Sequence, residues 1–203
     1  MTTVKVDVSD MSSKSIQIFL HPYLFEGNLE GMPDYIEVVA PEMGVFNAQI
    51  VKHMNAIERM CSGLNEEHIK YALMTSFMIV FLYSNKTVQG IMALNSEEDK
   101  LHVDIICTNS LQYKNTGTYL MNVANEIAIK LNKTTITLDA VEQAVPFYGR
   151  LGFTRVESQT IPMQKVVEQK PLQPLANTIA YRRSVRNKGG NKTRTRTRKN
   201  LKK

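Results

Sequence analysis

The sequence predicts a mixed α/β fold, in which a sheet with parallel and antiparallel strands carries helices on its faces. Two observations lead to this prediction. Three strand-like runs follow one another between residues 77 and 108, which favours antiparallel pairing. A helical stripe at residues 116–132 and an apolar run at residues 134–140 come next, and such a strand–helix–strand crossover gives a parallel pair.

Helices are predicted where apolar residues recur at three- and four-residue steps. Residues 42–62 show this spacing, and Asn65 then offers an N-cap for a second helix that runs to about residue 75. Residues 116–132 carry the most regular apolar stripe of the chain. A short helix at residues 142–150 is predicted to end at Gly152.

Strands are predicted where β-branched and apolar residues run together or alternate with polar ones. Residues 77–84 and 88–94 flank Asn85-Lys86-Thr87 and therefore predict a hairpin. In residues 101–108 the alternate positions Leu101, Val103, Ile105 and Cys107 are apolar, which predicts that these four side chains share one buried face.

The remaining strands are predicted from shorter runs. They are residues 16–20, 35–40, 134–140, 154–158 and 178–185, and residues 1–40 are the least regular part of the chain. Residues 162–174 are rich in proline and glutamine, so we expect a connection there.

The charge is unevenly distributed. Residues 186–203 hold nine Lys or Arg and no acidic residue, which leaves 16 basic and 19 acidic residues in the first 185. We therefore expect one domain over residues 1–185 and a disordered basic tail over residues 186–203. Such a tail could bind nucleic acid without sequence preference, act as a nuclear-localisation signal, or merely increase solubility.

Other features of the sequence bear on membrane association, metal binding and cellular location. The longest apolar run, residues 77–83, is too short to cross a bilayer, so no membrane association is expected. The two cysteines, Cys61 and Cys107, are too few for a disulfide framework or a zinc site, and we expect no metal. The first ten residues lack a signal-peptide core, so the predicted location is intracellular, cytoplasmic or nuclear.

The junction between the strand at 101–108 and the helix at 116–132 has the properties of an anion site. Gly117 allows close approach to the main chain, and the unpaired amides at residues 115–118 lie at the positive end of the helix dipole. Lys114 adds a positive charge, and residues 105–125 contain no Asp or Glu. These features suit a diphosphate, although a tight strand-to-helix turn alone would also explain them.

Two segments resemble motifs of the GNAT superfamily of N-acetyltransferases. Gln112-Tyr-Lys-Asn-Thr-Gly117 resembles the loop Q/R-x-x-G-x-G/A, and Ala144-Val-Pro-Phe-Tyr-Gly-Arg-Leu-Gly-Phe153 resembles A-x-x-F-Y-x-x-x-G-F. The resemblance spans about residues 77–153, and a strand near residues 180–183 would be the family's last. Asn115 replaces the first glycine of the loop, and Val141 stands where many members have Asn.

The resemblance implies a central, mostly antiparallel sheet with a parallel strand pair and helices on both faces. It also implies acetyl-CoA as the acetyl donor and an amine, on a small molecule or a protein, as the acceptor. The main chain of Ile105, Ile106 and Cys107 would hold the pantetheine arm. The pyrophosphate would lie against the loop residues Gln112, Tyr113, Lys114, Asn115, Thr116, Gly117 and Thr118.

The same resemblance gives Tyr148 the role of the general acid that protonates the departing thiolate. Tyr148 could instead be a packing aromatic beside Phe147 and Phe153. Asp104 is the candidate that helps to deprotonate the amine, with a solvated strand Asp as the alternative.

The other candidate side chains have weaker claims. His102, on the same strand face as Asp104, is a weaker candidate for the base, and His53 and His68 are expected to be structural. Cys107 is expected to be a small buried packing residue, so transfer would be direct, within a ternary complex.

The sequence is therefore compatible with two functions from different classes. One is an acetyl-CoA-dependent N-acetyltransferase. The other is a nucleic-acid-binding protein whose GNAT-like body has lost activity through Asn115 and Val141 and which binds through its basic tail.

Overall fold

The computed structural model describes residues 14–109, 115–156 and 161–167. All of them belong to a compact unit that spans Met1–Leu172, and the second unit, Gln173–Lys203, lies outside the described residues. The predicted domain boundary at residue 185, the strand at residues 178–185 and the basic tail therefore also lie outside them.

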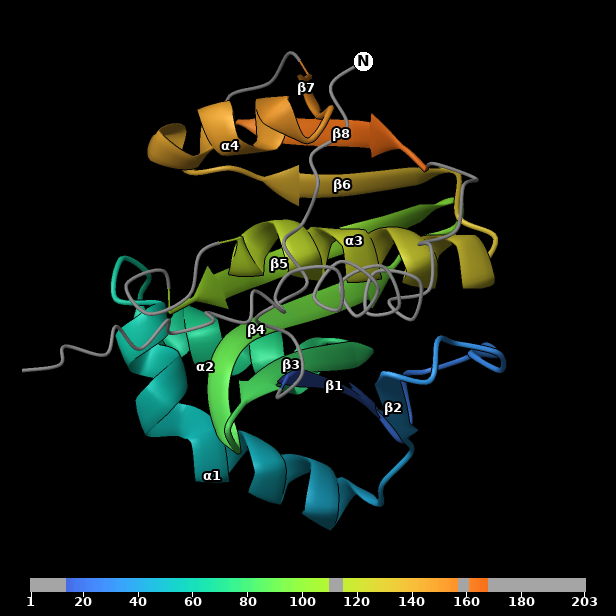
Figure 1. The fold of residues 1–203 in the computed structure, drawn as a ribbon, viewed down its shortest axis with the longest axis vertical. Helices are drawn as coiled ribbons and strands as arrows, with labels where there is room; N and C mark the ends of the chain where they lie inside the picture. The colour runs from blue at the N-terminus through green and yellow to red at the C-terminus, as the bar shows by residue number, and fades with distance from the viewer. Residues whose placement is uncertain (1–13, 110–114, 157–160, 168–203) are drawn as a thin grey trace, which may run out of the picture. The chain divides into compact units, whose positions relative to one another are not determined.

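The described strands form one eight-stranded sheet in the order β2-β1-β3-β4-β5-β6-β8-β7 (Figure 1). The strands are β1 Lys14–Leu20, β2 Ile36–Val39, β3 Met78–Ser84, β4 Thr87–Ser96, β5 Lys100–Thr108, β6 Thr135–Asp139, β7 Thr154–Arg155 and β8 Pro162–Val166. The pairs β1–β2 and β5–β6 are parallel and the other neighbours are antiparallel. The predicted mixed sheet is confirmed, with two parallel pairs where one was expected.

The predicted hairpin is β3–β4. Asn85 and Lys86 form its turn and both have positive φ, 50° and 62°. A two-residue turn of this kind matches the twist of the flanking strands, and asparagine tolerates the left-handed conformation better than most residues. Thr87, expected in the turn, is already paired with Ser84 in the ladder.

The helices also fall close to the predicted positions. They are α1 Met43–Met60, α2 Glu66–Thr75, α3 Thr116–Lys130, the single 3₁₀ turn η2 Glu142–Ala144 and α4 Val145–Arg150. The predicted cap of α2 is confirmed, because the Asn65 side chain accepts hydrogen bonds from the amides of Glu67 and His68 at 2.8 and 3.4 Å. Capping of this kind stabilises a helix by about 1 kcal/mol.

Helices cover both faces of the sheet, as expected. On one face α1 and α2 bury an apolar cluster whose central side chains are Phe46, Ile57, Leu73, Phe81 and Ile91. On the other face α3 buries Leu120, Val123 and Ile127 against Met92 and Leu94 of β4, and the α4 region adds Tyr148 and Phe153 to the same cluster. The sheet therefore separates two apolar cores.

Strand β5 contains an extra residue at Asp104. Its register with β4 passes from Ala93↔Ile105 to Leu94↔Val103, so that Asp104 has no counterpart. A β-bulge of this kind shifts the alternation of side chains by one. Leu101 and Val103 consequently enter the core beneath α3, whereas Ile105 and Cys107 enter the core beneath α1 and α2. The prediction that these four side chains share one face is wrong.

The predicted connection at residues 162–174 is also wrong in its first part. Residues Pro162–Val166 form β8, which lies between β6 and β7 and pairs with both. Proline is tolerated at the first position of a strand, where the missing N–H is not needed for the ladder. The strand predicted at residues 154–158 is described only as the two residues of β7.

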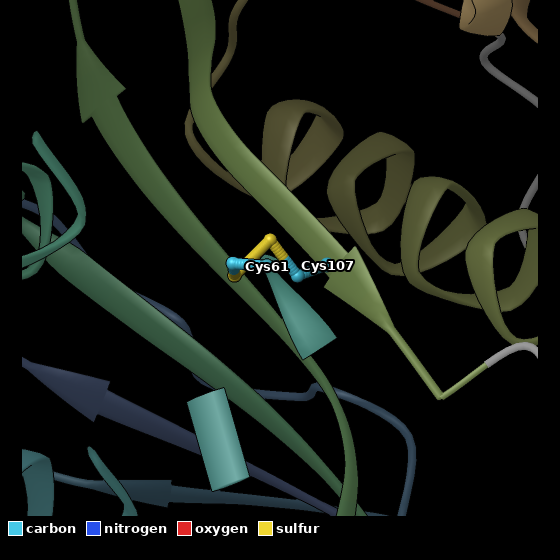
Figure 2. Close-up of a disulfide and its surroundings, with 2 residues drawn as sticks. All are labelled: Cys61 and Cys107. Atoms are coloured by element: carbon cyan, nitrogen blue, oxygen red, sulfur yellow. A yellow bond between two sulfur atoms is a disulfide. The ribbon is translucent and has the colours of Figure 1, made fainter. Parts of the chain in front are cut away.

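Cys61 and Cys107 form a disulfide, with a Cα–Cα distance of 5.3 Å (Figure 2). Cys61 follows the last residue of α1, and the bulge in β5 turns Cys107 toward that helix. The expectation that Cys107 is only a small packing residue is therefore wrong. Strict alternation along β5 would have pointed its side chain into the opposite core.

We predict that replacing both cysteines by alanine lowers the free energy of unfolding by about 4 kcal/mol. The bond joins residues that are separated by 46 positions, and closing a loop of this length restricts the unfolded chain. Urea denaturation of the wild type and the C61A/C107A variant, each with and without a phosphine reductant, measures the effect. Reductant should destabilise only the wild type, and a wild type insensitive to reductant would contradict the prediction.

Candidate active site

Strand β5 separates from β6 at the position of the bulge. The pairing of β5 with β6 runs from Lys100↔Thr135 to Val103↔Leu138 and ends there, whereas the pairing with β4 continues to Thr108. Figure 1 shows the two strands diverging beyond this point. β6 therefore does not pair with β5 from Asp104 onward, and within the described residues no other strand pairs with that edge of β5.

The hydrogen bonds to β4 decide which amides of β5 lie at this open edge. The Asn109 amide donates to the Gln89 carbonyl at 2.8 Å, and hydrogen-bonded pairs alternate with non-bonded pairs along an antiparallel ladder. With the observed register, the main-chain groups of Cys107 and Ile105 point toward β4. Those of Ile106 point to the open edge, so this residue offers both a donor and an acceptor there.

Helix α3 begins after a residue with an unusual main-chain conformation. Asn115, its N-cap, adopts the left-handed conformation with φ of 65°, which glycine adopts readily and asparagine tolerates better than most residues. The first turn of α3 contains no acidic residue, and the Asn115 side chain does not cap it. Gln112, Tyr113 and Lys114, the other predicted phosphate ligands, lie outside the described residues.

Two glycines bring the parts of the site together. A Cβ atom on Gly90 of β4 would stand 3.0 Å from side-chain atoms of both Thr116 and Leu120, so its absence lets the first turn of α3 lie close to the sheet. A Cβ atom on Gly117 would stand 3.1 Å from the Phe147 ring. The two sequence motifs, which lie apart in the chain, therefore meet where Gly117 contacts Phe147.

Tyr148 follows Phe147 in α4 and is 6% exposed. Its ring lies edge-on to Phe147 and Phe153, with centroid distances of 5.0 and 5.7 Å. Burial raises the pKa of the Tyr148 phenol to about 12, because the charged phenolate is disfavoured away from water. Tyr148 is thus a packing aromatic that also keeps its proton at neutral pH.

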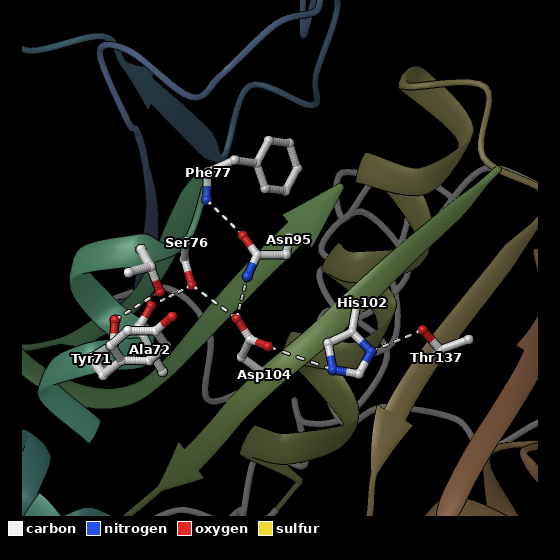
Figure 3. Close-up of polar contacts among 9 residues, drawn as sticks. Tyr71, Ala72, Ser76, Phe77, Asn95, His102, Asp104 and Thr137 are labelled. Atoms are coloured by element: carbon white, nitrogen blue, oxygen red, sulfur yellow. Dashed lines mark hydrogen bonds and ion pairs between the residues drawn. The ribbon is translucent and has the colours of Figure 1, made fainter. Parts of the chain in front are cut away.

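Asp104 stands in a polar cluster that links α2, β4, β5 and β6 (Figure 3). Its Oδ2 accepts a hydrogen bond from Asn95 Nδ2 at 2.5 Å and lies 3.3 Å from Ser76 Oγ, and its Oδ1 lies 3.5 Å from His102 Nε2. The other nitrogen of His102, Nδ1, is 3.0 Å from Thr137 Oγ1. The carboxylate is therefore held on both oxygens.

Partial burial is the main influence on the Asp104 carboxyl group. The side chain is 22% exposed, and desolvation raises its pKa above the ordinary value for aspartate. His102, Ser76, His68 and Asn95 act in the opposite direction by favouring the ionised form. A partly buried carboxylate with a raised pKa is a better proton acceptor than a freely solvated one.

The other two predicted histidines lie in different surroundings. His53 Nε2 is 3.2 Å from the Tyr83 hydroxyl, and its ring contacts those of Phe81 and Tyr83 beneath α1. His68 is exposed on α2, and its main-chain amide is bonded to Asn65. Neither belongs to the hydrogen-bonded cluster around Asp104.

Sequence reasoning missed four residues of the site: Ser76, Gly90, Asn95 and Thr137. Gly90 interrupts the apolar part of β4 and Asn95 directly follows it, and these two positions are the signal that could have identified them. Ser76 and Thr137 give no comparable signal, because serine after a helix and threonine in a strand are ordinary.

Within the described residues, no group of three or more His, Cys, Asp or Glu side chains is arranged to hold a metal ion. None of the helices in the same part of the chain is long and apolar enough to cross a membrane. Val141, which stands where many GNAT members have Asn, is half exposed in front of η2.

A comparison with protein families identifies the family of this chain. The family described as acetyltransferase (GNAT) domain matches residues 50–164, which is more than half of the chain. The chain belongs to the GNAT family. The match includes Asp104, the open edge of β5, the start of α3 and Tyr148, so the predicted resemblance and the fold that it implied are both confirmed.

Solved structures of GNAT proteins resemble this GNAT domain in fold. GCN5 from Tetrahymena is 16% identical, with a TM-score of 0.54, and the match covers 77% of this chain and 98% of that one. The ribosomal-protein-S18-alanine N-acetyltransferase from Escherichia coli is 15% identical, with a TM-score of 0.50 and coverage of 65% and 94%.

A third match is the paiA N-acetyltransferase from Thermoplasma acidophilum, solved in complex with coenzyme A. It is 15% identical, with a TM-score of 0.46 and coverage of 63% and 96%. At these identities the first two structures, with TM-scores of 0.54 and 0.50, show the fold of the chain. The family match adds the class of reaction, acetyl transfer.

Proposed function

We propose that this GNAT protein transfers the acetyl group of acetyl-CoA to an amine by direct attack within a ternary complex. The observation that carries the proposal is the separation of β5 from β6 at Asp104, beside a helix start without acidic residues. This arrangement provides an open strand edge for an extended, amide-containing arm and a group of amides for a diphosphate.

The described residues fit acetyl-CoA in two places. The peptide groups of Ile106 lie at the open edge, where they would pair with the amides of the pantetheine arm, while Ile105 and Cys107 anchor the strand to β4. The amides of residues 115–118 would hold the pyrophosphate together with Gln112, Tyr113 and Lys114. Bound acetyl-CoA supplies a thioester whose carbonyl carbon is open to nucleophilic attack.

Tyr148 is the proposed general acid. A thiolate leaves when the thioester is cleaved, and the Tyr148 phenol is protonated at neutral pH and can donate to it. Burial raises the pKa of this phenol to about 12, which makes it a weaker acid than an exposed tyrosine. The contact between Gly117 and Phe147 supports this role, since it brings α4 to the start of α3. An amide N–H at the open edge of β5 would stabilise the negative charge that develops on the carbonyl oxygen.

Asp104 is the proposed base, acting directly or through a water molecule. An amine acceptor must lose a proton before it attacks, and Asp104 stands where β5 parts from β6, at the end of the open edge. His102 contacts the same carboxylate and is the second candidate. Direct transfer is supported by the disulfide, which leaves Cys107 without a free thiol to carry an acetyl group.

The acceptor is proposed to be an amine on a small molecule or a protein. The Escherichia coli relative is named for its acceptor, an alanine of ribosomal protein S18, and that acceptor is a property of that protein. The family match and the structures above are acetyltransferases and do not support the nucleic-acid-binding alternative. The basic tail on which that alternative depends lies outside the described residues.

We predict that the protein binds coenzyme A and releases free thiol from acetyl-CoA in the presence of an amine acceptor. Calorimetry with coenzyme A measures the binding, and a thiol-reactive dye measures turnover over a panel of polyamines, aminoglycosides, lysine peptides and peptide N-termini. No heat at millimolar coenzyme A with a folded sample would contradict the proposal.

A proline substitution tests whether the open edge of β5 binds coenzyme A. In Ile106→Pro the lost N–H faces the open edge, so the ladder to β4 keeps its hydrogen bonds. This variant should keep the far-UV circular dichroism of the wild type. Its dissociation constant for coenzyme A should be at least tenfold higher. Unchanged affinity would show that the open edge does not hold the arm.

Replacing Tyr148 by Phe is predicted to lower kcat about a hundredfold, because a positioned general acid contributes that much or more. The ring packing against Phe147 and Phe153 stays in place, so the affinity for coenzyme A and the melting temperature should change little. Steady-state kinetics and calorimetry on the two proteins test this. Full turnover in the variant would remove Tyr148 from the chemistry.

Asp104→Asn is predicted to slow the reaction about a hundredfold at neutral pH and to recover at high pH, where the free amine is abundant. In the wild type the activity should fall as the pH drops through the pKa of Asp104. Because burial raises that pKa, the fall should occur above the pH at which an exposed aspartate titrates. A variant with the same pH profile as the wild type would exclude the base role.

A further inference from the structure

Asn95 is a polar residue in the apolar strand β4, and its side chain reaches the bulge in β5. It pairs with His102 in the ladder, next to the point where Asp104 has no counterpart. Its amide contacts two groups from different parts of the sheet, the main-chain N–H of Phe77 and the carboxylate of Asp104 (Figure 3).

The two contacts fix the orientation of the Asn95 amide. The N–H of Phe77 lies 3.1 Å from Asn95 Oδ1 and can only donate a hydrogen bond. The oxygen of the amide must therefore face Phe77, and the Nδ2 group must face Asp104 Oδ2 at 2.5 Å. The flipped amide would place two donors against each other and two acceptors against each other.

Ser76 is a second donor to Asp104, at a longer distance than Asn95. Its hydroxyl group has one proton, and its Oγ lies 2.5 Å from the Ala72 carbonyl oxygen and 3.3 Å from Asp104 Oδ2. The carbonyl can only accept, so Ser76 shares its proton between the carbonyl and the carboxylate. By distance, Asn95 is the closer of the two donors to Asp104.

We propose that Asn95 is a positioning residue for Asp104, which holds Oδ2 in the ionised carboxylate and leaves Oδ1 to face His102 and the acceptor. This inference rests on the proposed function of Asp104 as the base. Its distinctive consequence is that the acidity of Asp104 depends on a residue of the neighbouring strand that touches neither substrate.

The charged groups that face Asp104 limit what else could set its acidity. His102 faces it from β5 and His68 from α2, and Ser76 and Asn95, which do not titrate in this range, face it from the end of α2 and from β4. The Asn95 amide makes the shortest of these contacts with the carboxylate, and it donates without titrating itself.

Asn95→Leu removes the donor and keeps a side chain of similar size. In full-length protein labelled with ¹³C at the aspartate carboxyl groups, the signal of Asp104, assigned with Asp104→Asn, should titrate at a higher pH in the variant. The value of kcat/KM should fall about tenfold on the acid side of the profile and less than about twofold on the alkaline plateau. The KM for acetyl-CoA should stay unchanged.

Two further variants keep the test decisive. Ser76→Ala should raise the titration midpoint of Asp104 by less than Asn95→Leu does, because the Ser76 hydroxyl is the longer contact and is also bonded to the Ala72 carbonyl. If Asn95→Leu does not fold, Asn95→Thr, which is too short to reach the carboxylate and suits a strand, replaces it. An unchanged midpoint in the folded Asn95 variant, or a larger rise in Ser76→Ala than in the Asn95 variant, overturns the inference.

The failure of this inference can be told apart from the failure of the proposed function. If Asp104→Asn alters the pH profile but the Asn95 variant moves neither the titration nor the profile, Asp104 is the base and Asn95 does not position it. If the Asn95 variant moves the titration while Asp104→Asn leaves the profile unchanged, the contact is established, but the positioning role in catalysis is overturned along with the base.

Discussion

The single extra residue at Asp104 is the constraint on which the site depends. Because a bulge shifts the alternation of side chains, the two halves of β5 feed different cores, one beneath α3 and the other beneath α1 and α2. The pairing with β6 ends at the residue before it. One insertion therefore opens a strand edge, turns Cys107 toward Cys61 and places a carboxylate at the start of the opening.

The opening is useful only because α3 begins beside it, and this depends on missing side chains. Gly90 lets the first turn of α3 lie on β4, and Gly117 makes room for the Phe147 ring. If an alanine stood at either position, its Cβ contact would be tighter than most real Cβ contacts, and the neighbouring side chain would have to shift slightly. Membership of the GNAT family, shown by the match over residues 50–164, agrees with this arrangement.

Local patterns predicted those parts of the fold that local interactions determine. The stripe of α1, the Asn65 cap and the Asn85-Lys86 turn each depend on residues a few positions apart. The bulge, the disulfide and β8 depend instead on pairing between distant segments, which periodicity does not encode. The motifs led to Tyr148 and the start of α3 as candidates, but the contacts of Asp104 with Asn95 and Ser76 come from strand register and the end of α2.

The disulfide affects how the chain connects the proposed base with the proposed general acid. It closes residues 61–107 into a covalent macrocycle that contains His68, Ser76, Asn95, His102 and Asp104. Tyr148 and α3 lie outside this macrocycle and are joined to it by the chain after Cys107. Asp104 and His102, the candidates that would take a proton from the amine, therefore lie inside the macrocycle. Tyr148, the candidate that would give a proton to the thiolate, lies outside it. Loosening of α3 or α4 would then move Tyr148 and the first turn of α3, whereas Asn95, Asp104 and Ile106 stay within the closed loop.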